Sequence, residues 1–476
     1  MPYKGEYANK TSHFNILNSK DVQDFISDTN YLEKPSAEAT EKISQQFIQI
    51  EGAEESKFPN KIVSVDGSYY ESSIDQFLPS TKVGYIKIGS LLIDLDQYSN
   101  MGVEGTKFVD PFKVAKMQDN NSTATFTMPS ANIIKKGKDS VVDSFRYYID
   151  KHLLDCRMNE SDYKTSLRST LFELATYRPD SKNKDPNVII LHKCPNSDCD
   201  QENIELKDIE QEQFCPNPEC GIELYPSDAL RIWEEVKNYQ SNGSAISRFM
   251  IVLEHLMPIF LIRHIKNYHS ENSLATLQNL SFVIDGPLAI FGTAAWLSRA
   301  IMQYLWKINE EQLNAGFGPL LYLGLQKTGQ LMDFMYVINN HVEDNRLLLV
   351  DDALRYKYVA FSRNPSKSGF GYETYYGQDF MYKSKTGRSF VFSLPFPFKE
   401  KDVTGEYNKN RQKLENYKTL NSAISFIDHF ECDLFENAVV PIALAHRYTA
   451  ISLKPGAQAL DILTKNMVSE TIQNGS

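Results

Sequence analysis

The chain has little cysteine and shows no long uninterrupted apolar run. Six cysteines among 476 residues are too few for the disulfide framework of a small secreted protein. The apolar stretch 281–297 is broken by Asp285, Gly286 and Pro287, and it is shorter than the ~20 apolar residues that cross a bilayer. Residues 1–15 lack the apolar core of a signal peptide. We therefore expect a cytoplasmic protein without a membrane segment.

Positive charge is also scarce. Lysine and arginine total 50 against 61 acidic residues, which gives a net charge of −11 at pH 7. This balance excludes a uniformly basic protein that coats nucleic acid, although it is compatible with a local basic groove. The hydrophobic share of 42% and the charged share of 23% are those of a globular protein. They exclude a disordered chain, a collagen and a coiled-coil rod.

Strand-like and helix-like patterns alternate along the chain. Strands are indicated at 61–65, 82–95, 281–285 and 320–325, and helices at 162–177, 293–311 and from 441 onward. We predict a mixed α/β core that is interrupted by an insertion. In chain order the expected parts are an N-terminal helical region (1–60), the first part of the core (61–189), a cysteine-bearing ribbon (190–226), a helical insertion (227–275) and the second part of the core with C-terminal helices (276–476).

Four of the six cysteines form two close pairs. Cys194 and Cys199 enclose Pro-Asn-Ser-Asp, and Cys215 and Cys220 enclose Pro-Asn-Pro-Glu. Two tight turns that each supply two thiolates match the ligand set of a tetrahedral zinc site. Four thiolates leave no open coordination position for catalysis, so we expect a structural zinc ribbon. Two disulfides or four free thiols are the alternatives, and a cytoplasmic location favours zinc over both.

The cysteine segment is acidic. Residues 193–226 contain nine acidic and two basic side chains. This charge repels phosphate, so we expect the ribbon to stabilise the fold or to dock another protein rather than to read DNA.

Two aspartates follow apolar strand patterns and precede a glycine. They are Asp66 in VSVDGSYYE (63–71) and Asp285 in FVIDGPLAIFG (282–292). Carboxylates at the ends of neighbouring strands, with a third from a helix, form an oxygen site for Mg²⁺ or Mn²⁺. Such a site activates water for phosphodiester cleavage. An Asp-Gly pair after a strand is also an ordinary turn, so the spacing alone leaves both interpretations open.

Five segments in the same order resemble the motifs of the NurA nuclease family. The strand that ends in Asp66-Gly67-Ser68 resembles its first metal-binding motif, and VIDGPL (283–288) with Asp285 resembles its third. The other three are the helix SLRSTLFELAT (166–176), which points to Glu173, the strand LYLGLQKTG (321–329) with Lys327, and PIALAHRYTAIS (441–452), which points to His446. The long interval between the second and third motifs contains the predicted insertion.

The resemblance implies an RNase H-like fold and Mn²⁺- or Mg²⁺-dependent cleavage of DNA, as an exonuclease and a single-strand endonuclease. Asp66, Glu173 and Asp285 would hold the catalytic ions, and Lys327 and His446 would act at the phosphate. It also implies a homodimer that binds a HerA-like hexameric ATPase. The biological setting would be phage defence or DNA end processing. Lys327 as a solvated strand-end lysine and His446 as an ordinary helical histidine are the competing interpretations.

Two other functions are compatible with the pattern. An actin-like kinase or ATPase also places Asp-Gly turns at strand ends, but it has an Asp-x-Gly-x-Thr phosphate turn that neither Asp66 nor Asp285 begins. A non-catalytic adaptor would use the ribbon and the long helices to organise an assembly. Residues 355–418 are basic and rich in tyrosine, which is typical of a single-strand DNA channel but equally of strands with core tyrosines.

Overall fold

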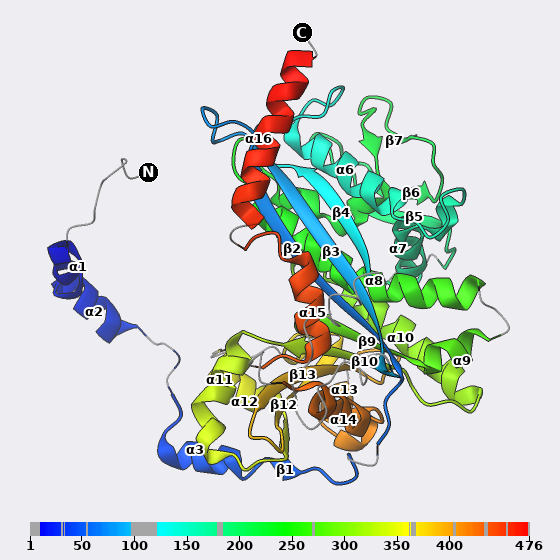
Figure 1. The fold of residues 1–476 in the computed structure, drawn as a ribbon. Helices are drawn as coiled ribbons and strands as arrows, with labels where there is room; N and C mark the ends of the chain where they lie inside the picture. Colours follow the sequence, from blue (N-terminus) through cyan, green and yellow to red (C-terminus); the bar gives the residue numbers. More distant parts are fainter. Residues whose placement is uncertain are drawn as a thin grey trace.

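One large sheet runs through the molecule, and helices cover both of its faces (Figure 1). The computed structural model describes residues 10–29, 32, 34–53, 56–96, 121–178, 184–268, 272–360, 362, 368–402, 406–432, 437–453 and 456–474. In these ranges the expected mixed α/β class is confirmed.

The large sheet has nine strands in the order β1-β11-β12-β13-β10-β9-β2-β3-β4. Their bounds are Ile48–Gln49 (β1), Lys61–Ser73 (β2), Lys82–Asp94 (β3), Asn121–Pro129 (β4), Leu280–Asp285 (β9), Leu321–Gln326 (β10), Arg346–Leu349 (β11), Gly377–Lys383 (β12) and Ser389–Pro395 (β13). Two further two-stranded sheets pair β5 (Val188–Lys193) with β6 (Glu202–Lys207) and β7 (Gln213–Phe214) with β8 (Glu223–Leu224).

The centre of the sheet has the strand order of an RNase H-like core. β2, β3 and β4 form an antiparallel meander, whereas β9 runs parallel to β2 and β10 parallel to β9. The order β4-β3-β2-β9-β10 with these directions is the one that the sequence resemblance implies. β2 is much longer than β9, because its pairing with β9 ends at Val65 and Ile284 while its pairing with β3 continues to Ser73. The two strands therefore separate just where Asp66 and Asp285 follow.

Two layers of helices enclose the sheet (Figure 1). On one face α8 packs against β2 and β3, and on the other face α15 does so. The main helices are α6 (Val141–Asp155), α7 (Leu167–Ala175), α8 (Gly243–Tyr268), α9 (Ser273–Gln278), α10 (Trp296–Asn314), α11 (Gln330–Ile338), α12 (Asp352–Leu354), α13 (Glu406–Asn410), α14 (Leu420–Phe430), α15 (Val440–Thr449) and α16 (Gly456–Asn474).

α8 lies inside the core, although the sequence pattern suggests a helical insertion at 227–275. It is long and apolar enough to cross a membrane by length and composition alone, but 72% of its most apolar window is buried in the molecule. Phe249, Leu253 and Leu256 of this helix belong to the same buried cluster as Val65 and Ile88 of the central strands. The apolar character of α8 therefore results from its central position between the sheet and the other helices.

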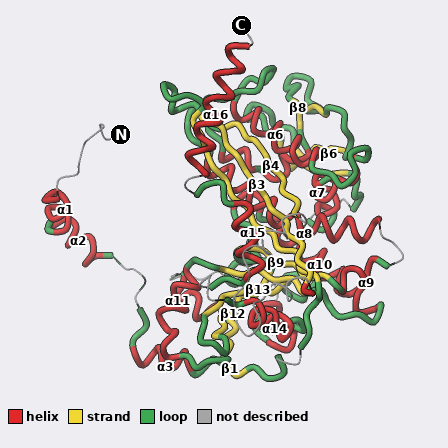
Figure 2. Tube along the Cα trace, in the orientation of Figure 1, coloured by secondary structure: helices red, strands yellow, loops and turns green. Residues whose placement is uncertain are grey.

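Three helices precede the sheet. α3 (Ala37–Ser44) begins where the Ser36 hydroxyl accepts a hydrogen bond from the Ala39 N–H, as an N-cap does. α1 (Lys10–Leu17) and α2 (Lys20–Asp28) extend away from the body (Figure 2). Phe14 and Phe25 on these two helices are 69% and 67% exposed.

Candidate functional site

The structure brings Asp66, Asp285 and His446 together. Each offers a ligand atom, and these atoms all lie within 4.8 Å of one another. Asp66 lies on β2, Asp285 is the last residue of β9, and His446 lies on α15, which packs against β2. The sequence resemblance pointed to all three residues, which are far apart along the chain.

The glycine that follows each aspartate is required for a different structural reason. A Cβ atom on Gly67 would lie 2.8 Å from the Glu254 Oε1 atom and 2.7 Å from the Ile88 side chain, so the glycine lets α8 approach β2 closely. Gly286 has a φ of +107°, which glycine adopts without strain. The chain therefore turns away directly after Asp285, and the Asp285 carboxylate stays at the end of the strand.

Hydrogen bonds and an ion pair fix the two carboxylates. One oxygen of Asp66 accepts a hydrogen bond from the Thr449 hydroxyl at 2.7 Å and lies 3.0 Å from His446 Nδ1. Lys327 Nζ lies 2.6 Å from an Asp285 oxygen. Lys327 follows β10, the neighbour of β9, so the sheet itself sets this pair. Lys327 and His446 therefore lie beside the two acids, and their expected action at the phosphate stays a prediction.

The two aspartates differ in how they hold a proton. Burial raises the pKa of Asp66, but hydrogen bonds from His446 and Thr449 outweigh it, and the pKa of Asp66 is lowered. Burial raises the pKa of Asp285 to about 6, Lys327 opposes this rise, and the nearby charge of Asp66 adds to it. The hydrogen bond to Asp66 raises the pKa of His446. Closely spaced carboxylates of this kind attract a cation.

Glu254 is a third acid at this place, and the sequence analysis missed it. It lies on α8, is 7% exposed, and accepts a hydrogen bond from the Gly67 N–H. Consecutive residues of a strand face opposite sides of a sheet, so α8 reaches Gly67 from one face while α15 reaches Asp66 from the other. Burial, followed by the charges of Asp66 and Asp285, raises the pKa of Glu254 well above its usual value.

The structure does not bring Glu173, the third acid that the resemblance implies, into this group. Its carboxylate pairs with Arg263 at 2.8 Å, and it is absent from the group formed by Asp66, Asp285 and His446 among the described residues. α7, which carries Glu173, packs beside α8 and α10 rather than at the end of β9. Glu173 therefore joins α7 to α8 through Arg263. Glu254 is also outside that group, but it lies close enough to Asp66 and Asp285 for their charges to raise its pKa.

Glu254 and Glu173 form a matched pair for mutagenesis. We expect Glu254→Gln to lower metal-dependent cleavage about 100-fold or more, because glutamine cannot ionise to bind a cation beside Asp66 and Asp285. Glu173→Gln should change the rate less than about threefold and lower stability by about 1–2 kcal/mol through loss of the Arg263 pair. Rates and thermal melts of both variants check this. Equal losses of rate would contradict these different roles of Glu254 and Glu173.

Metal affinity should depend on pH in a defined direction. Because the pKa of Asp285 is about 6 without metal, a cation must displace a proton below that pH. Protonated His446 adds positive charge in the same range, since its pKa is raised. Mn²⁺ affinity should therefore be about tenfold weaker at pH 5 than at pH 7. Calorimetric titration at both values measures this, and equal affinities would rule the expectation out.

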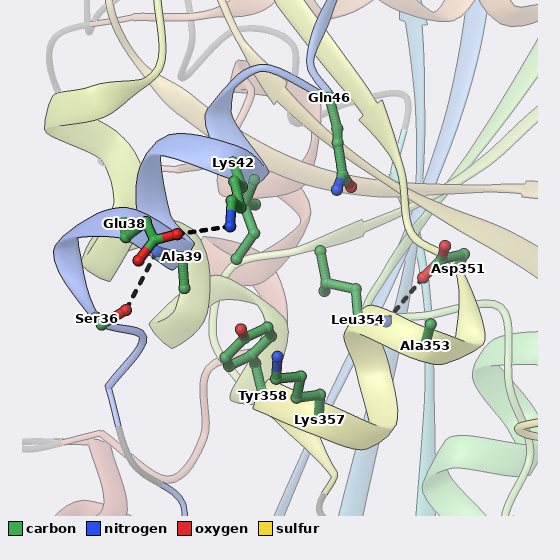
Figure 3. Close-up of a pocket in the computed structure, with 11 residues that line it drawn as sticks. Ser36, Glu38, Ala39, Lys42, Gln46, Asp351, Ala353, Leu354, Lys357 and Tyr358 are labelled. Carbon is green, nitrogen blue, oxygen red and sulfur yellow. Dashed lines mark hydrogen bonds and ion pairs between the residues drawn. The ribbon is translucent and has the colours of Figure 1, made fainter.

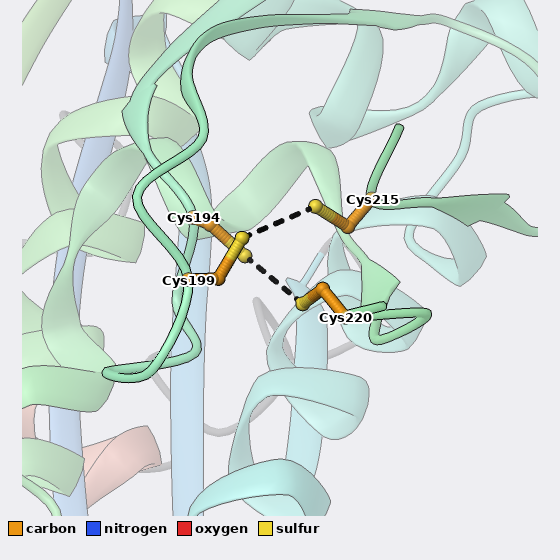
Figure 4. A group of neighbouring side chains, drawn as sticks. All are labelled: Cys194, Cys199, Cys215 and Cys220. Carbon is orange, nitrogen blue, oxygen red and sulfur yellow. Dashed lines mark hydrogen bonds between the residues drawn. The ribbon is translucent and has the colours of Figure 1, made fainter. Parts of the chain in front are cut away.

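The four paired cysteines also come together (Figure 4). The Sγ atoms of Cys194 and Cys220 are 3.8 Å apart, and those of Cys199 and Cys215 are 3.7 Å apart. Four sulfurs about 2.3 Å from one zinc ion lie about 3.8 Å from each other, whereas a disulfide needs about 2.05 Å. The spacing fits one tetrahedral ion and does not fit disulfides, and the hydrogen-bonding around the sulfurs fits thiolates.

The asparagine of each Cys-Pro-Asn turn has a role at the opposite turn. Asn196 Nδ2 donates to the Cys220 sulfur at 3.4 Å, and Asn217 Nδ2 donates to the Cys199 sulfur at 3.6 Å. N–H groups that point at ligand sulfurs stabilise their negative charge. Each turn therefore supports the ligands of the other, which explains why the same three residues occur in both.

Half of the tyrosines in the tyrosine-rich stretch belong to the core. Tyr376, Tyr382, Tyr407 and Tyr417 are each at most 5% exposed. Lys383 Nζ donates to the carbonyls of Asn339 and Val342. The channel interpretation of residues 355–418 therefore does not hold for these side chains.

The large cavity of about 450 Å³ lies away from the acids, between α3 and α12 (Figure 3). Lys42 pairs there with Glu38 at 2.7 Å. Asp351 accepts a hydrogen bond from the Leu354 N–H at 2.8 Å, so it caps α12. Glu38, Lys42 and Asp351 are thus engaged with each other or with a helix end, and Lys357 lies over the Tyr358 ring.

Comparison with known proteins adds little at the level of sequence. No protein-family model and no curated protein sequence matches the chain. A solved structure of the NurA nuclease from Sulfolobus solfataricus aligns with 98% of this chain and 99% of that chain, at 11% identity and a TM-score of 0.32. A structure of NurA with manganese aligns with 95% and 97%, at 13% identity and a TM-score of 0.21. These values are too low to carry the assignment, which rests on the strand order and the site.

Proposed function

We propose that the chain is a divalent-metal-dependent DNA nuclease. The observation that carries this proposal is the convergence of Asp66, Asp285 and His446 where β2 and β9 separate, with Glu254 near the two aspartates. Closely spaced carboxylates, with a lysine and a partly exposed histidine beside them, fit a site for Mn²⁺ or Mg²⁺. A bound ion there would lower the pKa of a water molecule and offset charge on a phosphodiester.

The side chains have distinct parts in this proposal. Asp66 and Asp285 would hold the ion, and Glu254 would complete the ligand set from the other face. Lys327 would offset negative charge on the phosphate. His446 bonds to Asp66 through Nδ1 and is 46% exposed, so Nε2 would be open to exchange a proton with water or the leaving group.

The proposal assigns zinc to the four cysteines, with a structural role. The sulfur spacing and the asparagine donors support a tetrahedral ion that is closed to substrate. Reduced thiols at this spacing also support a cytoplasmic location. Two ions of different chemistry would then serve the chain: a hard one at the carboxylates and a soft one at the sulfurs.

The HerA-like ATPase, the homodimer and the role in phage defence or DNA end processing remain part of the proposal. The exposed apolar side chains of α1 and α2 support an assembly, because contiguous apolar surface marks interaction sites. The larger ones are Phe14, Ile16, Leu17, Phe25 and Ile26. Mass photometry of the chain, alone and with the ATPase, tests this part, and a monomer in both samples would contradict it.

The kinase alternative fits the geometry less well. β2 continues through Gly67 and Ser68 to Ser73, paired with β3 throughout, so no phosphate-binding turn follows Asp66.

The experiment for the proposed function is a cleavage assay with the full chain. Mn²⁺ is added or omitted on single-stranded and duplex DNA, because a chelator would also remove an ion from the cysteines. Cleavage only with added ion supports the proposal. Nucleotide hydrolysis without DNA cleavage would replace it by the kinase.

A further inference from the structure

A second cavity, of about 250 Å³, lies at the base of the first cysteine hairpin. Its walls come from the end of α7, from β5, and from the short helices η3 (Pro226–Leu230) and η4 (Ile232–Glu235). The polar side chains that line it are Arg178, His192, Lys193, Arg231, Trp233 and Glu234, together with Asp228. We call this cavity the ribbon pocket.

The two acids of the ribbon pocket are already neutralised. Both oxygens of Asp228 accept hydrogen bonds from Arg146, at 2.8 and 2.6 Å. Both oxygens of Glu234 accept hydrogen bonds from Arg231, at 2.6 and 2.9 Å. Arg178 stacks on Trp296 and has no carboxylate partner within the described part of the chain. The pocket therefore keeps an excess of positive charge at Arg178 and Lys193.

The positive charge of the pocket helps to lower the pKa of two of its side chains. Burial lowers the pKa of Arg178, and the neighbouring Arg231 lowers it further. Burial also lowers the pKa of His192, with Arg178 and Arg231 as the next causes. In addition, the Trp233 indole N–H is buried and lacks an acceptor among the described residues. An anion in the pocket would relieve the repulsion and accept this hydrogen bond.

Most acidic residues of the ribbon lie elsewhere; the exception is Glu202, which lies opposite Lys193 across the hairpin and whose charge raises the pKa of His192. Asp198, Asp200, Glu202, Glu205, Glu210, Glu212 and Glu219 are exposed, and none lines the ribbon pocket. The net negative charge of residues 193–226 therefore hides a local separation of charge. Apart from Glu202, the acidic residues are on the outward side of the ribbon, and the pocket at its base keeps Arg178 and Lys193.

From this juxtaposition we propose that the ribbon pocket binds a backbone phosphate of a nucleic-acid strand through Arg178, Lys193 and the Trp233 N–H. The inference rests on the proposed function, since it names a second contact for the same substrate. The pocket is joined to the carboxylate site by the segment that follows Asp285. Trp296, at the end of that segment, stacks under Arg178 and donates a hydrogen bond to the Ala229 carbonyl at 3.0 Å.

Lys193 and Lys207 provide a matched test of charge. Both are exposed and lie on the same hairpin, but only Lys193 lines the pocket. Binding of a fluorescent 12-nucleotide single strand is measured by anisotropy over a range of salt, without added divalent ion so that no cleavage occurs. Lys193→Gln should weaken binding about three- to tenfold and reduce the salt slope by about 0.7. Lys207→Gln should change affinity less than about twofold and leave the slope unaltered.

Trp233→Phe tests the uncharged donor. It should weaken binding a few-fold without changing the salt slope, because no charge is lost. Inorganic phosphate should displace the strand from the wild-type chain better than chloride of equal ionic strength, and this advantage should disappear in Trp233→Phe. Circular dichroism confirms that each variant is folded.

Several results would overturn the proposal. One is identical behaviour of Lys193→Gln and Lys207→Gln, and another is unaltered binding by Trp233→Phe. Binding of inorganic phosphate in the pocket with no effect of the variants on the DNA strand would also reject it, since the ligand would then be a free anion. The Mn²⁺ cleavage assay is independent of these readouts. If Lys193→Gln and Lys207→Gln behave alike while Mn²⁺-dependent cleavage occurs, only the ribbon-pocket proposal is rejected. If the two variants differ as expected but no cleavage occurs, only the nuclease proposal is rejected.

Discussion

Asp66→Asn is expected to abolish metal-dependent DNA cleavage while the protein stays folded. The side chain is 3% exposed and lies between Thr449 and His446. Asparagine has the same shape and keeps an oxygen for the Thr449 hydroxyl, but it removes the charge that a cation needs. We expect a rate loss of about 1000-fold or more, which corresponds to about 4 kcal/mol of transition-state stabilisation.

The same substitution should change the stability of the metal-free protein only slightly, because two effects oppose each other. Hydrogen bonds from His446 and Thr449 lower the pKa of Asp66, so loss of its charge costs stability. The charge of Asp66 raises the pKa of both Asp285 and Glu254, so the folded state holds acids that repel each other. Removing one charge relieves this repulsion, as is common when functional residues are replaced.

Asp94→Asn is the matched control for this substitution. It lies at the end of β3 in the same sheet and away from the site. Cleavage rates and thermal melts of both variants are compared. Full activity in Asp66→Asn, or equal loss in Asp94→Asn, would refute the assignment of the site.

Cys199→Ser is expected to remove the metal from the cysteine site and to destabilise the ribbon. β7 and β8 are two residues long, and hairpins of that size are not stable alone in water. Structural zinc contributes on the order of 10 kcal/mol to small folded units. We therefore expect zinc content to fall from about one ion per chain to none and the melting temperature to fall by about 5 °C or more.

Cys156→Ser makes the same chemical change outside the cysteine site. Cys156 is partly buried, and burial raises the pKa of its thiol to about 11, so it is not expected to bind an ion. Elemental analysis and thermal melts of both variants check the prediction. A wild-type chain without zinc, or a Cys199→Ser chain that melts like Cys156→Ser, would contradict it.

Sequence reasoning located the parts of the site that follow strands. Asp66 and Asp285 lie where an apolar strand pattern ends. The glycine after Asp66 allows α8 to approach closely, and the glycine after Asp285 adopts a positive φ. Lys327 and His446 came only from the order of motifs, because a lysine after a strand and a histidine on a helix have no special pattern. In the structure all four are neighbours.

Sequence reasoning missed Glu254 because this residue lies in a long apolar helix. A single acid among apolar residues does not alter the helical pattern, so the sequence offered no reason to assign Glu254 a function. In addition, α8 resembles an inserted segment because it follows the cysteine hairpins. Glu173 was chosen from a helix of similar composition, and only the packing shows that this helix is a neighbour of α8. The pairing of strands that are distant in the chain, such as β2 with β9, decides which helix meets the site.

For the ribbon, the sequence predicted the metal-ligand cluster but not the distribution of charge. The cysteine spacing predicted the cluster, whereas net charge alone suggested a surface that repels phosphate. Net charge over a segment does not show where each side chain points, and the hairpins place their acids outward while Arg178 and Lys193 meet at the base.

Iron-directed cleavage of the polypeptide is the most direct test of the shared cation site. Fe²⁺ replaces Mn²⁺ at sites of oxygen and imidazole ligands, and with ascorbate and peroxide it generates radicals that cut the nearest backbone. Mass spectrometry of the wild-type chain should then show cuts near Asp66, Glu254, Asp285 and His446, and an excess of Mn²⁺ should suppress all of them together. Cuts at other places only, or cuts near Asp66 that occur without any near Asp285, would contradict a single ion held where β2 and β9 separate.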